Sequence, residues 1–274
     1  MYKRVLLALD LEGVNFVVGE PYGGLSADIE QYNIAKRQAV IEINAAAEAL
    51  FEAGVTSVGL WDNHAGGGNI DPADLDSRIV LHSKEKGARM SFAKDKYDCI
   101  CYFGYHTMEG TLGGVLAHTM NSKAVQFYKI DGKYVGEVDM DAAIAAEYGM
   151  PSRFFCGGDI SCKQAKRTVG DIVTVVTKTE LSRNKAEFRD NGELVSDIKK
   201  GIAEAVTLSA DAVRLSFPLA FEKSFKRVED AEKHLLRVRE YGIECDYPLD
   251  EVMGKDAHTV VSRVNDIDEF VKCI

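Results

Sequence analysis

The sequence has little of several features that mark particular classes of protein. Its 274 residues include 5 prolines and 1 tryptophan. No apolar run approaches the roughly 20 residues that span a bilayer. Lys and Arg number 33 against 43 Asp and Glu, a formal net charge of -10. This acidic balance disfavours nucleic acid and anionic membranes as partners, because both attract basic faces. The opening "MYKR" leads into a short apolar run that stops at Asp10, so we expect no signal peptide.

The cysteines give no sign of a disulfide framework. None of the six belongs to a C-x-x-C pair, and two of them lie inside an apolar strand pattern; they are Cys99, Cys101, Cys156, Cys162, Cys245 and Cys273. This pattern favours buried reduced thiols over disulfides or a thiolate metal site. Reduced thiols without a signal peptide predict a cytoplasmic protein.

The first half of the chain alternates strand and helix patterns. Apolar runs predict strands at 3–11, 55–62 and 97–106, and helical periodicity covers 28–54, ending at Gly54. The segment 73–83 is ambiguous, with a strand favoured. Such alternation is typical of an α/β fold, here a mainly parallel sheet flanked by helices.

In the second half, the pattern of expected helices and strands changes after about residue 190. Before that point, a hairpin is expected over 122–137 with its turn at Asp131-Gly132. The remaining expected elements are a helix at 138–150, strands at 152–159 and 171–178, and helices at 194–211 and 228–241. We predict a main α/β domain of residues 1–190 and a smaller C-terminal α/β lobe of residues 191–274, with a soft boundary.

Acids and histidines follow the strongest strand patterns. In "LLALDLEGVN", Asp10 and Glu12 are two residues apart, so in a strand both would point to the same face. Like charges at that range repel, and burying them unpaired costs several kcal/mol, so a positive charge is expected between them, either a bound cation or a basic side chain. His64 ends the second strand and His106 ends the third. Ligands of open parallel sheets bind beyond the carboxyl ends of the strands, where these side chains converge.

Two further polar residues complete the pattern: Glu137, where the hairpin meets the next helix, and His118 in "GGVLAHTMNS". Carboxylates and imidazoles suit zinc, and the ligand types also allow Mn or Co. Three carboxylates exceed the charge of one Zn²⁺, whereas two ions about 3.5–4 Å apart balance it better. We therefore predict a metal centre in the main domain, formed by Asp10, Glu12, His64, His106 and Glu137. The other histidines are expected to be solvated or capping: His82, His234 and His258.

Five ordered motifs resemble one family. "LDLEGV", "DNH", "YFGYHT", "GVLAHTM" and "VGEVDMDAA" are similar to the zinc-dependent D-aminopeptidases of the dipeptide-transport operon type (DppA-like). The resemblance continues more weakly through "FFCGGD" and "VVTKTELSRNKAE". It implies that Asp10 bridges two zinc ions. Glu12 and Glu137 would complete one metal's shell, and His64 and His106 the other's.

The resemblance also implies an activity and an assembly. The family removes N-terminal D-residues, typically D-Ala, from short peptides, and assembles as a homodecamer of two stacked pentameric rings. His118 matches the family's catalytic histidine, described there as a nucleophile; on physical grounds we favour general acid/base catalysis or oxyanion stabilisation. Asn63 and the segment 65–76 depart from the family pattern beside the expected substrate entrance, which leaves specificity open.

Two alternatives remain. "LLALDLEGV" also resembles the strand of haloacid-dehalogenase-like Mg-dependent phosphatases, which ends in D-x-D-G-T. However, Glu12 and Val14 depart from that pattern, and three histidines would have no role. The other alternative is a metal- or peptide-binding protein without turnover.

Overall fold

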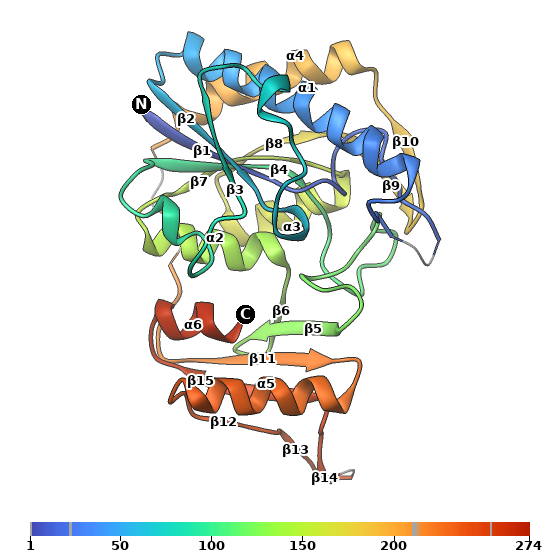
Figure 1. The fold of residues 1–274 in the computed structure, drawn as a ribbon, viewed down its shortest axis with the longest axis vertical. Helices are drawn as coiled ribbons and strands as arrows, with labels where there is room; N and C mark the ends of the chain where they lie inside the picture. The colour runs from blue at the N-terminus through green and yellow to red at the C-terminus, as the bar shows by residue number, and fades with distance from the viewer. Residues whose placement is uncertain (1, 22–23, 210–211, 213, 253) are drawn as a thin grey trace.

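A parallel six-stranded sheet forms the larger part of the molecule (Figure 1). The computed structural model describes residues 2–21, 24–209, 212, 214–252 and 254–274. In spatial order, the strands of this larger sheet are β3 (Ile79–Ser83), β2 (Ser57–Asp62), β1 (Arg4–Leu9), β4 (Cys99–Tyr105), β7 (Ser152–Gly157) and β8 (Val173–Val176). All neighbours pair in parallel. The prediction of a mainly parallel sheet flanked by helices is confirmed.

Helices cover both faces of the larger sheet (Figure 1). On one face lie α1 (Glu30–Glu52) and α4 (Asn191–Ala205), and on the other lie α2 (Glu137–Glu147) and α3 (Asp159–Val169). Successive side chains of the central strand β1 alternate between two hydrophobic clusters. Leu7 joins the cluster of α1 and α4, and Leu6 joins that of α2. This burial on both faces explains why β1 is an unbroken apolar run.

The strand order defines where a ligand can bind. The chain passes from β1 to β2 and β3 on one side, and then returns to place β4 on the other side of β1. The connections therefore diverge between β1 and β4, which opens a crevice at the carboxyl ends of these strands.

A smaller antiparallel sheet lies below the larger one (Figure 1). Its strands, in spatial order, are β12 (Cys245–Asp246), β15 (Thr259–Val264), β11 (Leu219–Phe225), β5 (Val125–Ile130) and β6 (Lys133–Val135). Helix α5 (Val228–Glu240) packs on this sheet, and α6 (Ile267–Cys273) contacts both β15 and α2. The domain boundary at residue 190 stays a prediction. The structure adds that α4 packs on α1, and that β5 and β6 join the smaller sheet from earlier in the chain.

The remaining elements are short. Two hairpins pair β9 (Lys178–Ser182) with β10 (Lys185–Phe188) and β13 (Leu249–Asp250) with β14 (Gly254–Lys255). The 3-10 turns are η1 (His64–Gly66), η2 (Pro72–Asp74) and η3 (Ser91–Ala93). Within the described ranges, no helix has both the length and the apolar character needed to cross a membrane.

Several local expectations can be checked. All six cysteines are free and buried, as predicted. The expectation of solvated or capping histidines is wrong for His82 and His234, which are both buried. His82 Nε2 lies 2.6 Å from the hydroxyl of Tyr97, and the ring of His234 packs against Phe225. Both ring nitrogens of His82 have hydrogen-bond partners, whereas Nε2 of His234 has none among the described residues.

Candidate metal centre

Asp10 and Glu12 lie at the carboxyl end of β1, held tightly against the end of β4. Asp10 N donates to Phe103 O at 2.8 Å, and Gly13 N donates to Gly104 O at 2.6 Å. A Cβ on Gly13 would lie 2.2 Å from the carbonyl oxygen of Tyr105. The "LEGV" segment therefore needs glycine at this position, because any side chain would push the acidic loop away from β4.

His64 begins the turn that follows β2. The carboxylate of Asp62 accepts hydrogen bonds from the backbone N of Gly68 and of Asn69, at 2.8 and 2.7 Å. The side-chain amide of Asn69 donates to Asp62 and also to the carbonyl oxygen of His64, at 2.7 Å. The glycine-rich segment thus forms a turn beside His64, and this turn fixes the position of the imidazole.

His106 and His118 are oriented by backbone carbonyl groups. Nδ1 of His106 donates to Thr107 O at 2.9 Å, and Nδ1 of His118 donates to Leu116 O at 2.8 Å. Because a carbonyl can only accept, each neutral ring keeps its proton on Nδ1 and leaves Nε2 as the free acceptor. The two rings stack, with centroids 3.9 Å apart and planes 9° apart.

Glu137 is the first residue of α2. Its carboxylate accepts a hydrogen bond from Met120 N at 2.7 Å. The next acid on this helix, Asp139, accepts a hydrogen bond from Gly136 N and so caps the helix. The capped helix directs Glu137 into the crevice beside His118, whose Nε2 lies 3.9 Å away.

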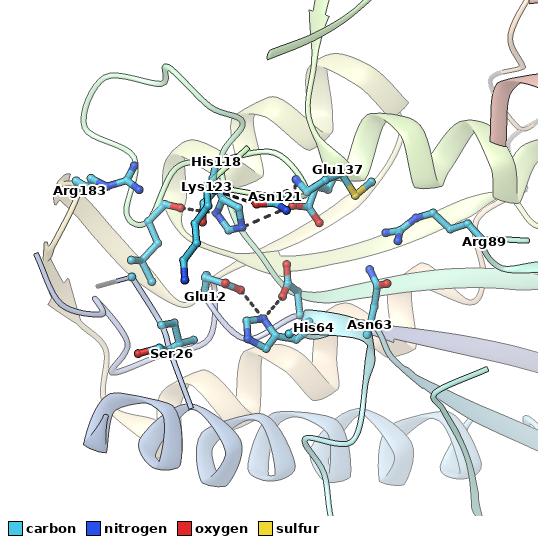
Figure 2. Close-up of a pocket in the computed structure, with 18 residues that line it drawn as sticks. Glu12, Ser26, Asn63, His64, Arg89, His118, Asn121, Lys123, Glu137 and Arg183 are labelled. Atoms are coloured by element: carbon cyan, nitrogen blue, oxygen red, sulfur yellow. Dashed lines mark hydrogen bonds and ion pairs between the residues drawn. The ribbon is translucent and has the colours of Figure 1, made fainter. Parts of the chain in front are cut away.

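The predicted ligands form three candidate metal groups among the described residues, and Figure 2 shows Glu12, His64, His118 and Glu137 around the same space. Two of the groups share Asp10, and the third consists of Glu12, His106 and His118. One oxygen of Asp10 lies 2.9 Å from His64 Nδ1, and the other lies 3.4 Å from His106 Nε2. Glu12 lies 3.1 Å from His64, and Glu137 lies 3.3 Å from His106. Within each group the candidate ligand atoms lie within 4.8 Å of one another. This grouping pairs each histidine with a different acid, unlike the grouping that the family resemblance implies.

Burial makes the carboxylates and imidazoles of this centre strongly interdependent. Burial, reinforced by the charge of Glu12, raises the pKa of Asp10 to about 7. Burial alone would lower the pKa of His64, but the carboxylates of Glu12 and Asp10 outweigh it and raise that pKa to about 11. The pKa of Glu12, which burial alone would raise, is instead held well below its usual value by the charge of His64.

The other half of the centre behaves in the same way. Burial would lower the pKa of His106, yet its contacts with Glu137 raise it to about 10. Burial would raise the pKa of Glu137, yet His106 lowers it to about 2. His118 differs, because burial and the charge of His106 both lower its pKa. The acids therefore require positive charge between them, whereas His118 is kept neutral.

These residues fit a metal ion. Nε2 of His106 is buried and has no hydrogen-bond partner among the described residues, although it faces two carboxylates. Buried ring nitrogens normally have a hydrogen-bond partner, so the unpaired Nε2 of His106 needs an explanation. A metal-ligating histidine typically binds through one nitrogen while the other donates to a carbonyl group, which is the arrangement of His106 here.

Two buried charged side chains on β9 hold the loops of the centre, and the sequence analysis did not identify them. Lys178 Nζ donates to the carbonyl oxygens of Glu12 and Val14, at 2.6 and 3.0 Å, and also to that of Val17. Glu180 accepts from Val115 N at 2.7 Å, within the loop that carries His118. Both lie in "VVTKTE", where charged residues alternate along a strand pattern. That alternation is the signal that could have indicated them.

A cavity of about 490 Å³ opens over the centre. Three basic side chains line it. Figure 2 shows Arg89 on one side, and Lys123 and Arg183 on the other. Arg89 donates to both carboxylate oxygens of Asp141, at 2.6 and 2.8 Å. None of these three residues lies directly at the end of a strand of the larger sheet, so none was predicted from the sequence.

The fold and the centre define a doubly wound α/β protein with a carboxylate–imidazole site at its switch point. The family model described as D-aminopeptidase matches residues 3–239, and the chain belongs to this peptidase family. The resemblance noted from the sequence motifs is thereby confirmed. The haloacid-dehalogenase-like phosphatase alternative is wrong, because the chain belongs to a peptidase family.

Two similar proteins give further context. The chain is 22% identical over 183 residues to the D-aminopeptidase of Bacillus subtilis (strain 168). That match covers 66% of this chain and 65% of the relative's length. The fold is also similar to a solved structure described as the Zn-dependent D-aminopeptidase DppA from Bacillus subtilis, a self-compartmentalizing protease. The TM-score is 0.85 at 20% identity, over 98% of this chain and 94% of the other. This likeness establishes the fold.

Proposed function

We propose that this chain is a dinuclear zinc aminopeptidase that removes N-terminal residues, of D configuration, from short peptides. The observation that carries the proposal is the position of Asp10, whose two oxygens face two different imidazoles. A carboxylate placed in this way can bridge two ions. Family membership supports the peptidase class, and the names of both similar proteins support the D configuration.

The ligand groups assign a role to each side chain. Glu12 and His64 would hold one ion, and His106 and Glu137 the other, with Asp10 shared between them. When bound, two such ions supply Lewis-acid polarisation of a carbonyl group and a water of lowered pKa. The set of nitrogen and oxygen ligands suits zinc, and it also accommodates Mn or Co.

His118 would move the proton of the reaction. Its Nδ1 is committed to Leu116 O, so Nε2 is the atom that can accept and return a proton. Its lowered pKa keeps it neutral and therefore available as a base at neutral pH. Nε2 would accept a proton from the attacking water and deliver it to the departing amine nitrogen, which regenerates the neutral ring.

We further propose a homo-oligomer, a decamer on the family pattern, in the cytoplasm. The similar solved structure is described as self-compartmentalizing, which supports an assembly. Large exposed apolar side chains such as Leu112 and Leu249 offer contact surface. Six free thiols support a reducing compartment. Light scattering tests the assembly, since a decamer has ten times the 30.1 kDa of one chain.

The test of the function combines elemental analysis with kinetics. Protein purified without added metal or chelator should hold about two zinc-like ions per chain, as a two-metal site requires. It should cleave D-alanyl tripeptides faster than L-alanyl ones, and removal of the metal should abolish cleavage. A protein that fails to bind zinc on titration, or that binds zinc and cleaves neither peptide, would contradict the proposal.

A further inference from the structure

A second cavity adjoins the metal cavity. It has a volume of about 500 Å³ and shares four lining residues with the first: Gly24, Ser122, Lys123 and Arg183. These residues come from three segments that are far apart in the chain. Because both cavities are lined by the same side chains, they meet at Lys123 and Arg183.

The two cavities differ in charge. The floor of the metal cavity is acidic, formed by Asp10, Glu12 and Glu137. The second cavity has Lys226 in addition to the two shared cations, and no acidic side chain among the described residues that line it. Lys226 Nζ donates to Ser122 O at 2.5 Å, in the loop that carries Lys123. The acids of the metal cavity are proposed metal ligands whose charge the metal would balance, whereas the far end of the second cavity keeps its positive charge.

The three cations of the second cavity have no ion-pair partner among the described residues. Arg89, on the opposite side of the metal cavity, is already neutralised by Asp141. By contrast, neither Lys123 nor Arg183 forms an ion pair within the part of the chain that the structure describes. Arg183 donates to Ala117 O at 2.6 Å, a bond to a neutral carbonyl that leaves its charge uncompensated. The hydroxyl of Ser26 and, to a smaller extent, the charge of Lys123 lower the pKa of Asp28.

We propose that Lys123 and Arg183 bind the C-terminal carboxylate of a short peptide substrate. This inference rests on the proposed peptidase function and adds the substrate class: di- and tripeptides with a free carboxylate. A short peptide at neutral pH has an ammonium at one end and a carboxylate at the other. The bond to be cleaved lies next to the N-terminal residue, so that end of the peptide would lie at the metal centre and its carboxylate would reach toward the basic far end. An extended peptide advances about 3.3–3.6 Å per residue, so few residues separate its two ends.

The arginine and lysine have different roles in this subsite. A guanidinium presents paired N–H donors that match the two oxygens of a carboxylate, whereas an ammonium acts as a point charge. Arg183 would set the orientation of the carboxylate, and Lys123 would supply attraction from the side of the metal centre. Figure 2 shows the Lys123 side chain extending toward Glu12, between Arg183 and the metal ligands.

The test compares one peptide with its carboxamide. Zinc-loaded enzyme is assayed on D-Ala-Gly-Gly and on the same peptide ending in a carboxamide. The free acid should have a kcat/KM at least about 10-fold higher, the effect expected of one charged hydrogen bond. Lys123→Gln should remove most of this preference by lowering kcat/KM for the acid alone, and Lys123→Glu should reverse it. Arg183→Gln also disturbs the His118 loop, but that effect is common to both peptides and cancels in the ratio.

Lys163→Gln is the matched control, because Lys163 is exposed on α3 and lines neither cavity. It should keep the acid preference of the unmodified protein. Equal kcat/KM for acid and carboxamide, or a preference that survives both Lys123→Gln and Arg183→Gln, overturns the subsite and leaves the peptidase function standing. Cleavage of neither peptide overturns the peptidase function, and the subsite with it.

Discussion

Replacement of Lys178 by methionine should weaken both metal binding and folding stability. The ammonium of Lys178 is buried beneath the acidic loop, where it donates to the carbonyl oxygens of Glu12, Val14 and Val17. Burial lowers its pKa to about 8, so the ammonium persists at neutral pH and its three hydrogens match three acceptors. Methionine has a similar length and fills the space, but it donates to none of them.

The size of the effect follows from these contacts. Each buried carbonyl left without a partner costs about 1–3 kcal/mol. Removing the ammonium also removes the free-energy cost of burying its charge. The shift of its pKa from 10.5 to about 8 corresponds to a cost of about 3 kcal/mol. The cost of the unpaired carbonyl groups should exceed this gain, so the free energy of unfolding should fall by about 3 kcal/mol in total. Because Glu12 is a proposed ligand, zinc affinity should also fall about 10- to 100-fold, as for other residues that orient metal ligands.

Urea denaturation of the metal-free protein measures the first effect, and competition with a chromophoric chelator measures the second. Lys163→Met serves as the control, since that side chain is exposed and its nearest partner is Asp159 on the surface. A Lys178→Met protein that matches the control in both measurements would refute the argument. A loss of stability with unchanged zinc affinity would show that the acidic loop holds its shape without this residue.

Three further predictions concern the centre and the core. His118→Ala should retain metal but lose at least about 100-fold in peptide cleavage, as expected for a general acid/base group; full cleavage with normal metal content would exclude that role. Asp10→Asn should lose both metals in elemental analysis, whereas Glu137→Gln should retain about one, because Asp10 faces both His64 and His106 while Glu137 belongs to a single candidate group. Burial raises the pKa of Glu42 to about 7 against 4.5 when unfolded, so the folded state binds the extra proton between these values. Stability should therefore fall by up to about 3 kcal/mol as the pH rises through that window, and urea denaturation at pH 5 and 8 should show Glu42→Gln lacking this loss.

The larger sheet could be predicted from the sequence because its strands are buried on both faces. Burial on both faces makes β1, β2 and β4 continuous apolar runs, and parallel strands bring their carboxyl ends to one edge whatever the intervening loops do. That rule places Asp10, Glu12, His64 and His106 together without knowledge of side-chain positions. Glu137 follows no parallel strand, and its place beside His106 depends on where α2 begins.

Other features depended on contacts that local patterns do not record. Helix α3 is short and mostly polar and buries only Ser161, Cys162 and Ala165 along one face, and it was not predicted from the sequence. The smaller sheet pairs β5 with β11, strands separated by almost a hundred residues, through antiparallel contacts that no single segment predicts. His82 and His234 were expected to be solvated or capping because histidine usually is, yet tertiary packing buries both.

The charges of the centre explain why two acids end the first strand. Without metal, protonated imidazoles supply the positive charge between the acids. The pKa values of about 11 for His64 and about 10 for His106 mean that both rings are charged at pH 7. A metal ion binds a neutral imidazole, so metal binding must release these protons, and acidification must weaken it. The surrounding chain is arranged for this exchange. Backbone carbonyl groups fix the ring of His106, and Lys178 holds the backbone that carries Glu12. The acids require positive charge, which metal would supply, and this charge keeps the stacked imidazole of His118 neutral. His118 is then free to accept and return the proton of the reaction.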